Sequence, residues 1–245
     1  MFALYKKELS SFFSSIMGYL TLVVFLVLTG LMLWVFRSDF NLLDYGYSSI
    51  DGLFFIGPFL YLFLIPAITM RMLAEERRNG TMELLLTKPL SEWQIVWAKF
   101  LAGITIVFIS LLPTLVYYFT VYSLGDPVGN IDTGSVIGSY IGLLFLGGAF
   151  VSIGLFASSL TNNQIVAFII AALLCAFMHL GFEAIFNMGF LGKVGLFIRN
   201  LGMATHYSSI SRGVIDSRDV IYFLSVIALF LMATRLVLQS RKWKK

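Results

Sequence analysis

The sequence predicts an all-helical integral membrane domain with six transmembrane helices. Of its 245 residues, 59% are hydrophobic and 12% are charged, whereas soluble domains average about 45–50% apolar and about 25% charged residues. The apolar residues also fall into six runs that are long enough to cross roughly 30 Å of hydrocarbon. We therefore expect a single transmembrane domain over residues 1–245.

Each predicted span is an apolar run of about 20 residues. The six runs are Met17 to Phe36, Leu53 to Met70, Phe100 to Val121, Val136 to Leu160, Ile165 to Phe186 and Val220 to Leu238. Only the last two contain a charged residue, Glu183 and Arg235, and each lies near the end of its run.

The distribution of basic residues predicts the orientation. Most of the 17 Lys and Arg residues lie at the two termini and in the loops that share their side of the membrane, and such loops face the cytoplasm. We predict a protein of the bacterial inner membrane with both termini cytoplasmic. Lys193, Arg199, Arg212 and Arg218 depart from this pattern.

The segments outside the spans also have predictable forms. Residues 1–15 carry apolar side chains at spacings of three and four, which predicts a helix lying in the inner interface; alternatively, they begin the first span. Residues 187–219 are too polar to span, so we expect a re-entrant or surface-lying hairpin on the outer side. Residues 239–245 form a basic tail.

Several classes of site are excluded by composition. One cysteine and two histidines cannot form a disulfide framework or a zinc cluster, so we expect no metal site. The short basic runs suit membrane topology, and we expect no nucleic-acid partner. The sequence contains no G-x-x-x-x-G-K-[ST] phosphate loop, so no ATP site and no bound cofactor are expected in this chain.

The loop from Arg71 to Lys99 is the one large polar feature on the predicted cytoplasmic side. Arg71 to Arg78 extends the second helix, and Asn79 and Gly80 terminate it. Thr81 to Thr87 then predicts a short helix with an exposed apolar side, and Pro89 ends it. Ser91 and Gln94 form a capping box that begins the third helix.

The string EERRNGTMELLL at residues 75–86, followed by Pro89 and Lys99, resembles the cytoplasmic loop of ABC-2 type transporter permeases. The helix layout resembles that family along nearly the whole chain. Residues 208–220 resemble a segment of the Gld-type gliding-motility permease of Bacteroidetes, and of nitrous-oxide-maturation permeases.

The resemblance implies a permease that is not itself an enzyme. Two permease subunits, the same or related, form the pathway, and two copies of a separate ATPase with ATP and Mg²⁺ drive it. Within the Gld resemblance, the second permease is a Gld-type membrane protein and the role is motility or export. The implied ATPase-docking residues are Glu75, Glu76, Arg77, Arg78, Gly80, Thr81, Met82, Glu83, Leu85, Leu86 and Pro89. We expect Glu83 to contact the ATPase.

Other interpretations remain open. Glu75 to Arg78 also fit a solvated, mutually paired helix end, which stabilises a fold by only about 0–1 kcal/mol per pair. His179 and Glu183 share a face of the fifth helix at i and i+4, which favours a hydrogen-bonded pair near its outer end. The same pair would serve an intramembrane enzyme or a secondary transporter as a proton relay or substrate contact.

Small residues on the fourth span predict close helix packing. Gly138 with Gly142, and Gly154 with Ser158, have the small-x-x-x-small spacing that lets helix backbones approach in membranes. Ordinary glycine enrichment in membrane spans explains the same residues equally well.

Overall fold

A computed structural model describes residues 1–44, 46–82, 91–188 and 192–240, with the backbone alone for residues 192–194. The described part contains six helical segments that are long and apolar enough to cross a membrane. These segments are α2 (Ile16–Gly30) with η1 (Leu31–Val35), α3 (Asp51–Arg78), α5 (Glu92–Leu111) with η2 (Leu112–Thr114) and α6 (Leu115–Leu124), α7 (Thr133–Leu160), α8 (Gln164–Ala176) with η3 (Phe177–Gly181) and α9 (Phe182–Asn187), and α12 (Ser217–Ser240).

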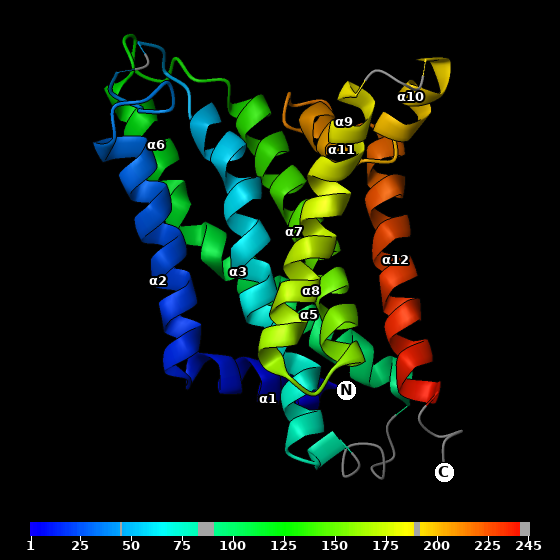
Figure 1. Cartoon of the computed structure of the whole chain (residues 1–245). Helices are drawn as coiled ribbons and strands as arrows, with labels where there is room; N and C mark the ends of the chain where they lie inside the picture. Colours follow the sequence, from blue (N-terminus) through cyan, green and yellow to red (C-terminus); the bar gives the residue numbers. More distant parts are fainter. Residues whose placement is uncertain (45, 83–90, 189–191, 241–245) are drawn as a thin grey trace.

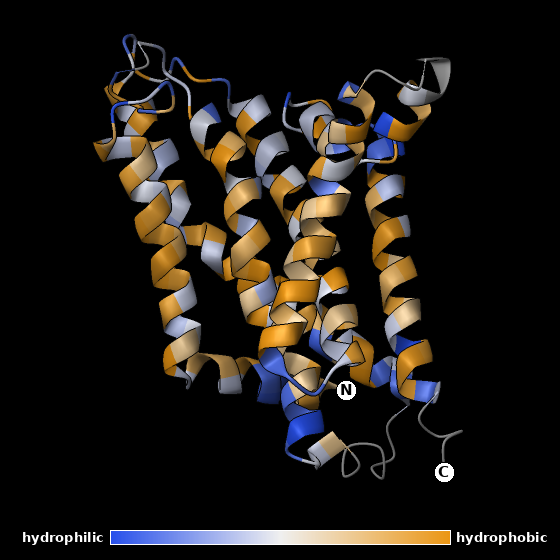
Figure 2. Cartoon of the chain, viewed as in Figure 1, coloured by the Kyte–Doolittle hydropathy of each residue, from blue (hydrophilic) through white to orange (hydrophobic). Residues whose placement is uncertain are grey.

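The predicted all-helical membrane fold is confirmed, and each predicted run falls within one of these segments to within one residue. Figure 2 shows the apolar residues along the middle of the long helices and hydrophilic residues gathered toward both ends. The helices α3 and α5 are longer than their apolar runs because polar residues continue them at the lower end of Figure 1, where α1 and the end of α12 also lie.

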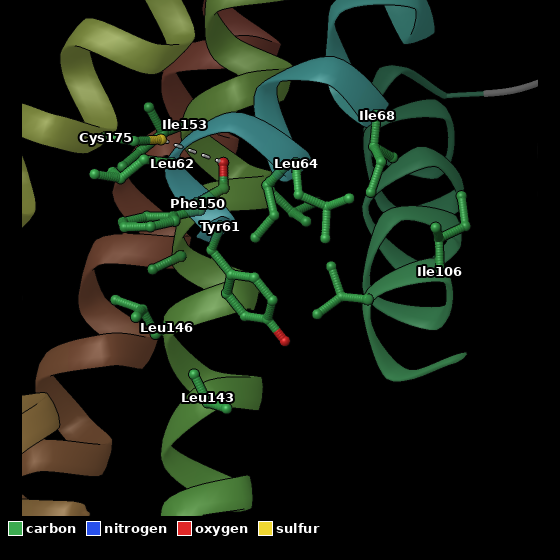
Figure 3. Close-up of a cluster of buried hydrophobic side chains, with 14 of the residues drawn as sticks. Tyr61, Leu62, Leu64, Ile68, Ile106, Leu143, Leu146, Phe150, Ile153 and Cys175 are labelled. Carbon is green, nitrogen blue, oxygen red and sulfur yellow. Dashed lines mark hydrogen bonds between the residues drawn. The ribbon is translucent and has the colours of Figure 1, made fainter. Parts of the chain in front are cut away.

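The helix α7 is the central element of the bundle, with 78% of its apolar window buried. Its side chains Leu143, Leu146, Phe150 and Ile153 belong to the buried core shown in Figure 3, together with Tyr61 of α3 and Cys175 of α8. The outer helices α2, α8 and α12 bury much less of their apolar surface, which suits helices that face lipid.

Small residues on α7 allow close approach, as their spacing predicts. A side chain at Gly154 would collide with Thr69 of α3. A Cβ at Gly138 would lie 2.8 Å from the Cα of Gly213. At the lower end, Ser158 Oγ accepts hydrogen bonds from the backbone N–H groups of Leu73 and Ala74.

The first helix, α1 (Phe2–Phe13), lies across the lower end of the bundle (Figure 1). Most of the apolar stripe expected from the sequence does pack, since Tyr5, Leu9 and Phe12 are half-buried against the bundle, whereas Phe2 at its start is 65% exposed. Leu4, next to this stripe, is buried and packs against Ile95 of α5. Glu8, one turn after Leu4, makes an ionic contact that is described below.

The segment between the last two spans contains two short helices at the upper end, α10 (Gly192–Arg199) and α11 (Met203–Ile210) (Figure 1). Tyr207 Oη donates a hydrogen bond of 2.7 Å to the Phe54 carbonyl of α3, and burial raises the pKa of this phenol. Ser135 and Ser139 of α7 both donate to the Ser211 carbonyl. The upper segment is thereby attached to both central helices.

Candidate functional site

The inner extension of α3 ends as the sequence predicts. Arg71 to Arg78 continue the helix, and Gly80 follows it with a positive φ of 69°, a conformation that glycine adopts without steric cost. Arg77 and Arg78 lie in the last turn, where cations interact favourably with the helix dipole. The α3 helix therefore carries its charged residues beyond its apolar run.

Lys99 of α5 is the centre of an ionic cluster at this end of the bundle. Its side chain is fully buried, and its Nζ lies 2.8 Å from Glu8 Oε1 and 2.9 Å from Glu76 Oε2. It also donates to the Met72 carbonyl at 2.6 Å. Lys99 therefore donates hydrogen bonds to Glu8 and to the Met72 carbonyl, while its contact with Glu76 is an ion pair without a hydrogen bond in the described structure.

Glu76 lies between two lysines, because Lys7 Nζ contacts its other oxygen, Oε1, at 3.3 Å. Its side chain is 10% exposed, and that of Lys7 is 59% exposed. We refer to Lys7, Glu8, Glu76 and Lys99 as the ionic cluster. Two positive and two negative charges balance within it, and it joins α1, α3 and α5.

The structure corrects the interpretation of residues 75–78 as a uniformly solvated helix end. Glu76 is buried in the ionic cluster, so it is not exposed to a partner. Glu75 fits that interpretation better, since it pairs with Arg71 one turn away at 3.0 Å and both side chains are about one-third exposed. Arg78 is exposed at the end of the helix.

The predicted docking helix, Thr81 to Thr87, lies mostly outside the described residues, as do Glu83, Leu85, Leu86 and Pro89. Thr81 is exposed, and its hydroxyl donates to the Glu76 carbonyl at 3.3 Å. Met82 was expected on an exposed apolar side, but only 2% of it is exposed and it belongs to the hydrophobic core. Burial removes Met82 from any surface offered to a partner.

The start of α5 confirms the predicted capping box. Ser91 Oγ accepts from the Gln94 backbone N–H at 3.3 Å, and Gln94 Oε1 accepts from the Ser91 N–H at 3.1 Å. The two reciprocal bonds satisfy donors that a helix end otherwise leaves free. They fix the point at which the chain returns from the loop to the bundle.

A second polar region lies at the opposite, upper end, where a cavity of about 620 Å³ separates α3 from η3, α9 and α11. His179 and Glu183 both line it, so the two intramembrane candidates do lie near one another. The expected hydrogen bond between them is absent from the described structure, where His179 Nδ1 has no partner. The π-helical turn of η3 (Phe177–Gly181) explains this, because its wider turn changes the angular spacing of an α-helix.

Comparisons with known proteins agree with the geometry of the chain. The sequence model of a family described as ABC-2 family transporter protein matches residues 2–195, from α1 through the α3 extension to the upper segment. A comparison with curated proteins found no match. The family match covers most of the chain, and the six apolar helices are those of a membrane protein. The chain therefore belongs to the ABC-2 family of transporter proteins and is a membrane permease of an ABC transporter.

Proposed function

We propose that this permease docks two copies of a separate ATPase subunit through the loop between α3 and α5, and that ATP and Mg²⁺ bind in those subunits. A second permease, identical or related, completes the transport pathway. The family implies an ABC ATPase partner in general. In the proposed orientation, both termini and this loop lie on the cytoplasmic side of a bacterial inner membrane.

The ionic cluster is the observation that best supports this proposal. It fixes the extension of α3 to α1 and to α5 at Glu76, two residues before the exposed Arg78 and five before the exposed Thr81. A displacement of the loop is then passed to three helices together, since separating them would leave charges buried without partners. Ser158 adds a direct connection from the same part of α3 to the central helix α7.

The residues of the loop have different roles in this mechanism. Glu76 and Met82 are buried, so we propose that they hold the loop against the membrane domain. We propose that the exposed Arg78 and Thr81, together with Glu83, Leu85, Leu86 and Pro89, provide the contact with the ATPase. Glu83 would then pair with a basic residue of the partner across a polar interface.

Reversing the charge of Glu83 tests the docking proposal. With Glu83→Arg, we expect the ATPase activity that depends on the assembled complex to fall about tenfold or more, because like charges across an interface cost several kcal/mol. Membrane insertion should not change. Hydrolysis by the purified complex and the amount of permease in membranes are the two measurements.

The matched control is Asp44→Arg, which makes the same charge change at an exposed site in the segment between η1 and α3. It should leave ATP hydrolysis at the wild-type rate. If Glu83→Arg retains full ATPase activity, Glu83 does not contact the ATPase.

We further propose that this transporter serves gliding motility or an associated export process, on the resemblance carried by residues 208–220. The partners would then be the Gld-type ATPase and a second Gld-type membrane protein. Residues 208–220 lie at the upper end, opposite the end of α3 that carries Arg78.

A further inference from the structure

We propose that the upper cavity binds one phospholipid whose headgroup carries both a phosphate and a primary ammonium group. The cavity is formed by the start of α3, by η3 and α9, by the end of α10 and by α11. Its volume of about 620 Å³ lies within the range of about 300–1,000 Å³ that is usual for small-molecule sites. It accommodates a headgroup, while the rest of the lipid lies in the bilayer.

The charged residues of the cavity indicate a ligand with charges of both signs. Arg199 and Arg212 provide two cations, and Asp51 and Glu183 provide two anions. Within the described part of the chain, no ion pair joins any of these four side chains. A phosphate would accept hydrogen bonds from the arginines, and an ammonium group would donate to a carboxylate. A ligand with one sign of charge would leave the other pair unneutralised.

Arg199 is positioned for such a contact. Its guanidinium group lies over the ring of Phe186, with the Cζ 5.4 Å from the ring centre. Its buried Nε has no hydrogen-bond partner in the described structure. Buried donors in native proteins nearly always have a partner, so this N–H points to an acceptor that binds in the cavity.

His179 provides a second buried polar group without a partner, deeper in the same cavity. Its side chain is 4% exposed, and its Nδ1 makes no hydrogen bond within the described residues. The ring lies edge to face against Phe59 and Phe150, with centres 6.3 and 6.0 Å away. Because the two phenylalanines pack against the ring and His179 lines the cavity, the imidazole is the polar group that meets an oxygen of the lipid phosphate or glycerol ester at this depth.

The apolar wall of the cavity accounts for the acyl chains. Phe55 and Phe59 line it one and two turns below Asp51 on α3, and they are 56% and 40% exposed. Charged groups at the end of the bundle and exposed aromatic groups toward its middle match the order of headgroup and chains in a membrane lipid.

Lipid binding is an equilibrium property of the permease alone, so it does not depend on the ATPase contact proposed above. The test uses the purified full-length permease in detergent, titrated with phosphatidylethanolamine and followed by native mass spectrometry. Phosphatidylglycerol lacks the ammonium group, and phosphatidylcholine has an ammonium group without N–H donors. We expect each to bind at least about tenfold more weakly than phosphatidylethanolamine.

Two sets of variants separate the cavity from lipid bound elsewhere. The double substitution Arg199→Gln and Arg212→Gln should weaken phosphatidylethanolamine binding about tenfold or more. Arg218→Gln removes a positive charge at the same end outside the cavity and should bind as the wild type does.

His179→Leu should weaken binding about five- to tenfold. Its thermal unfolding temperature should not fall, because the substitution removes a buried polar group that has no partner. A merely structural histidine would show the reverse, a lower unfolding temperature with unchanged binding. The proposal would be overturned if all variants bound phosphatidylethanolamine with equal affinity. It would also be overturned if phosphatidylglycerol or phosphatidylcholine bound to the wild type as tightly as phosphatidylethanolamine.

Discussion

Replacing Lys99 with methionine is expected to lower the free energy of unfolding by about 3–5 kcal/mol, the usual cost of removing one partner from a buried ion pair. The substitution keeps the length and the apolar stem of the side chain but removes the ammonium group. The carboxylates of Glu8 and Glu76, whose side chains are 12% and 10% exposed, would then remain buried without the ammonium group that pairs with both. The measurement is the unfolding temperature and yield of the purified permease.

Two further variants distinguish the loss of ionic contacts from a general effect of substitution. Lys6→Met changes an exposed lysine of α1 and should leave the unfolding temperature close to that of the wild type. Adding Glu8→Gln and Glu76→Gln to Lys99→Met should recover much of the loss, because neutral side chains cost less to bury than unpaired carboxylates. If Lys99→Met is as stable as Lys6→Met, Lys99 does not hold the three helices together.

Placing a side chain at Gly154 is expected to separate the two central helices. In Gly154→Ala, the new Cβ would collide with Thr69 Oγ1 and lie 2.7 Å from Thr69 Cβ. Thr69 cannot rotate away without cost, because it is fully buried and its hydroxyl donates to the Ile65 carbonyl at 2.9 Å. Overpacking of this kind costs about 1–3 kcal/mol, which thermal unfolding of the purified variant would measure.

A reciprocal substitution provides the control. Thr69→Gly combined with Gly154→Ala moves the side chain from α3 to α7 and should restore much of the stability lost in Gly154→Ala. Gly148→Ala, in the same helix, places its Cβ 3.3 Å from the end of the Ile227 side chain, so it should have little effect. Equal losses at positions 148 and 154 would show that the contact of Gly154 with Thr69 is not specifically tight.

The sequence predicted well those features that depend only on residues close to one another along the chain. The apolar runs give the six helices, because the cost of unpaired backbone groups in lipid requires a helix wherever such a run crosses the membrane. Gly80 ends α3 and the Ser91 and Gln94 pair begins α5, since each depends on chemistry within one helical turn.

The ionic cluster could not be predicted because it joins residues that lie far apart along the chain. Lys99 was recognised only as one of the basic residues that indicate orientation and as part of the family pattern. A buried and an exposed lysine look alike in a sequence, and here burial depends on where α1 and α3 pack against α5. The apolar residues on either side of Lys99, from Ile95 to Ala98 and from Phe100 onward, were the only local signal.

The interpretations of Met82 and of the pair His179 and Glu183 needed correction for similar reasons. Met82 follows a glycine turn whose direction the sequence does not specify, and that turn places it in the core. The spacing of His179 and Glu183 assumed a regular α-helix, whereas the π-helical turn at Phe177–Gly181 alters it.

The most direct test of the ATPase-docking proposal is crosslinking in native membranes. A photoreactive amino acid would be placed at Thr81, which is exposed next to Gly80, and separately at Glu83. The control position is Leu43, which is 65% exposed in the segment between η1 and α3. Mild-detergent purification and mass spectrometry would then identify the trapped protein.

The proposal predicts that positions 81 and 83 trap a nucleotide-binding protein and that position 43 does not. Crosslinks from positions 81 and 83 that join only parts of this chain, with no nucleotide-binding protein trapped, would contradict docking of an ATPase through the loop between α3 and α5.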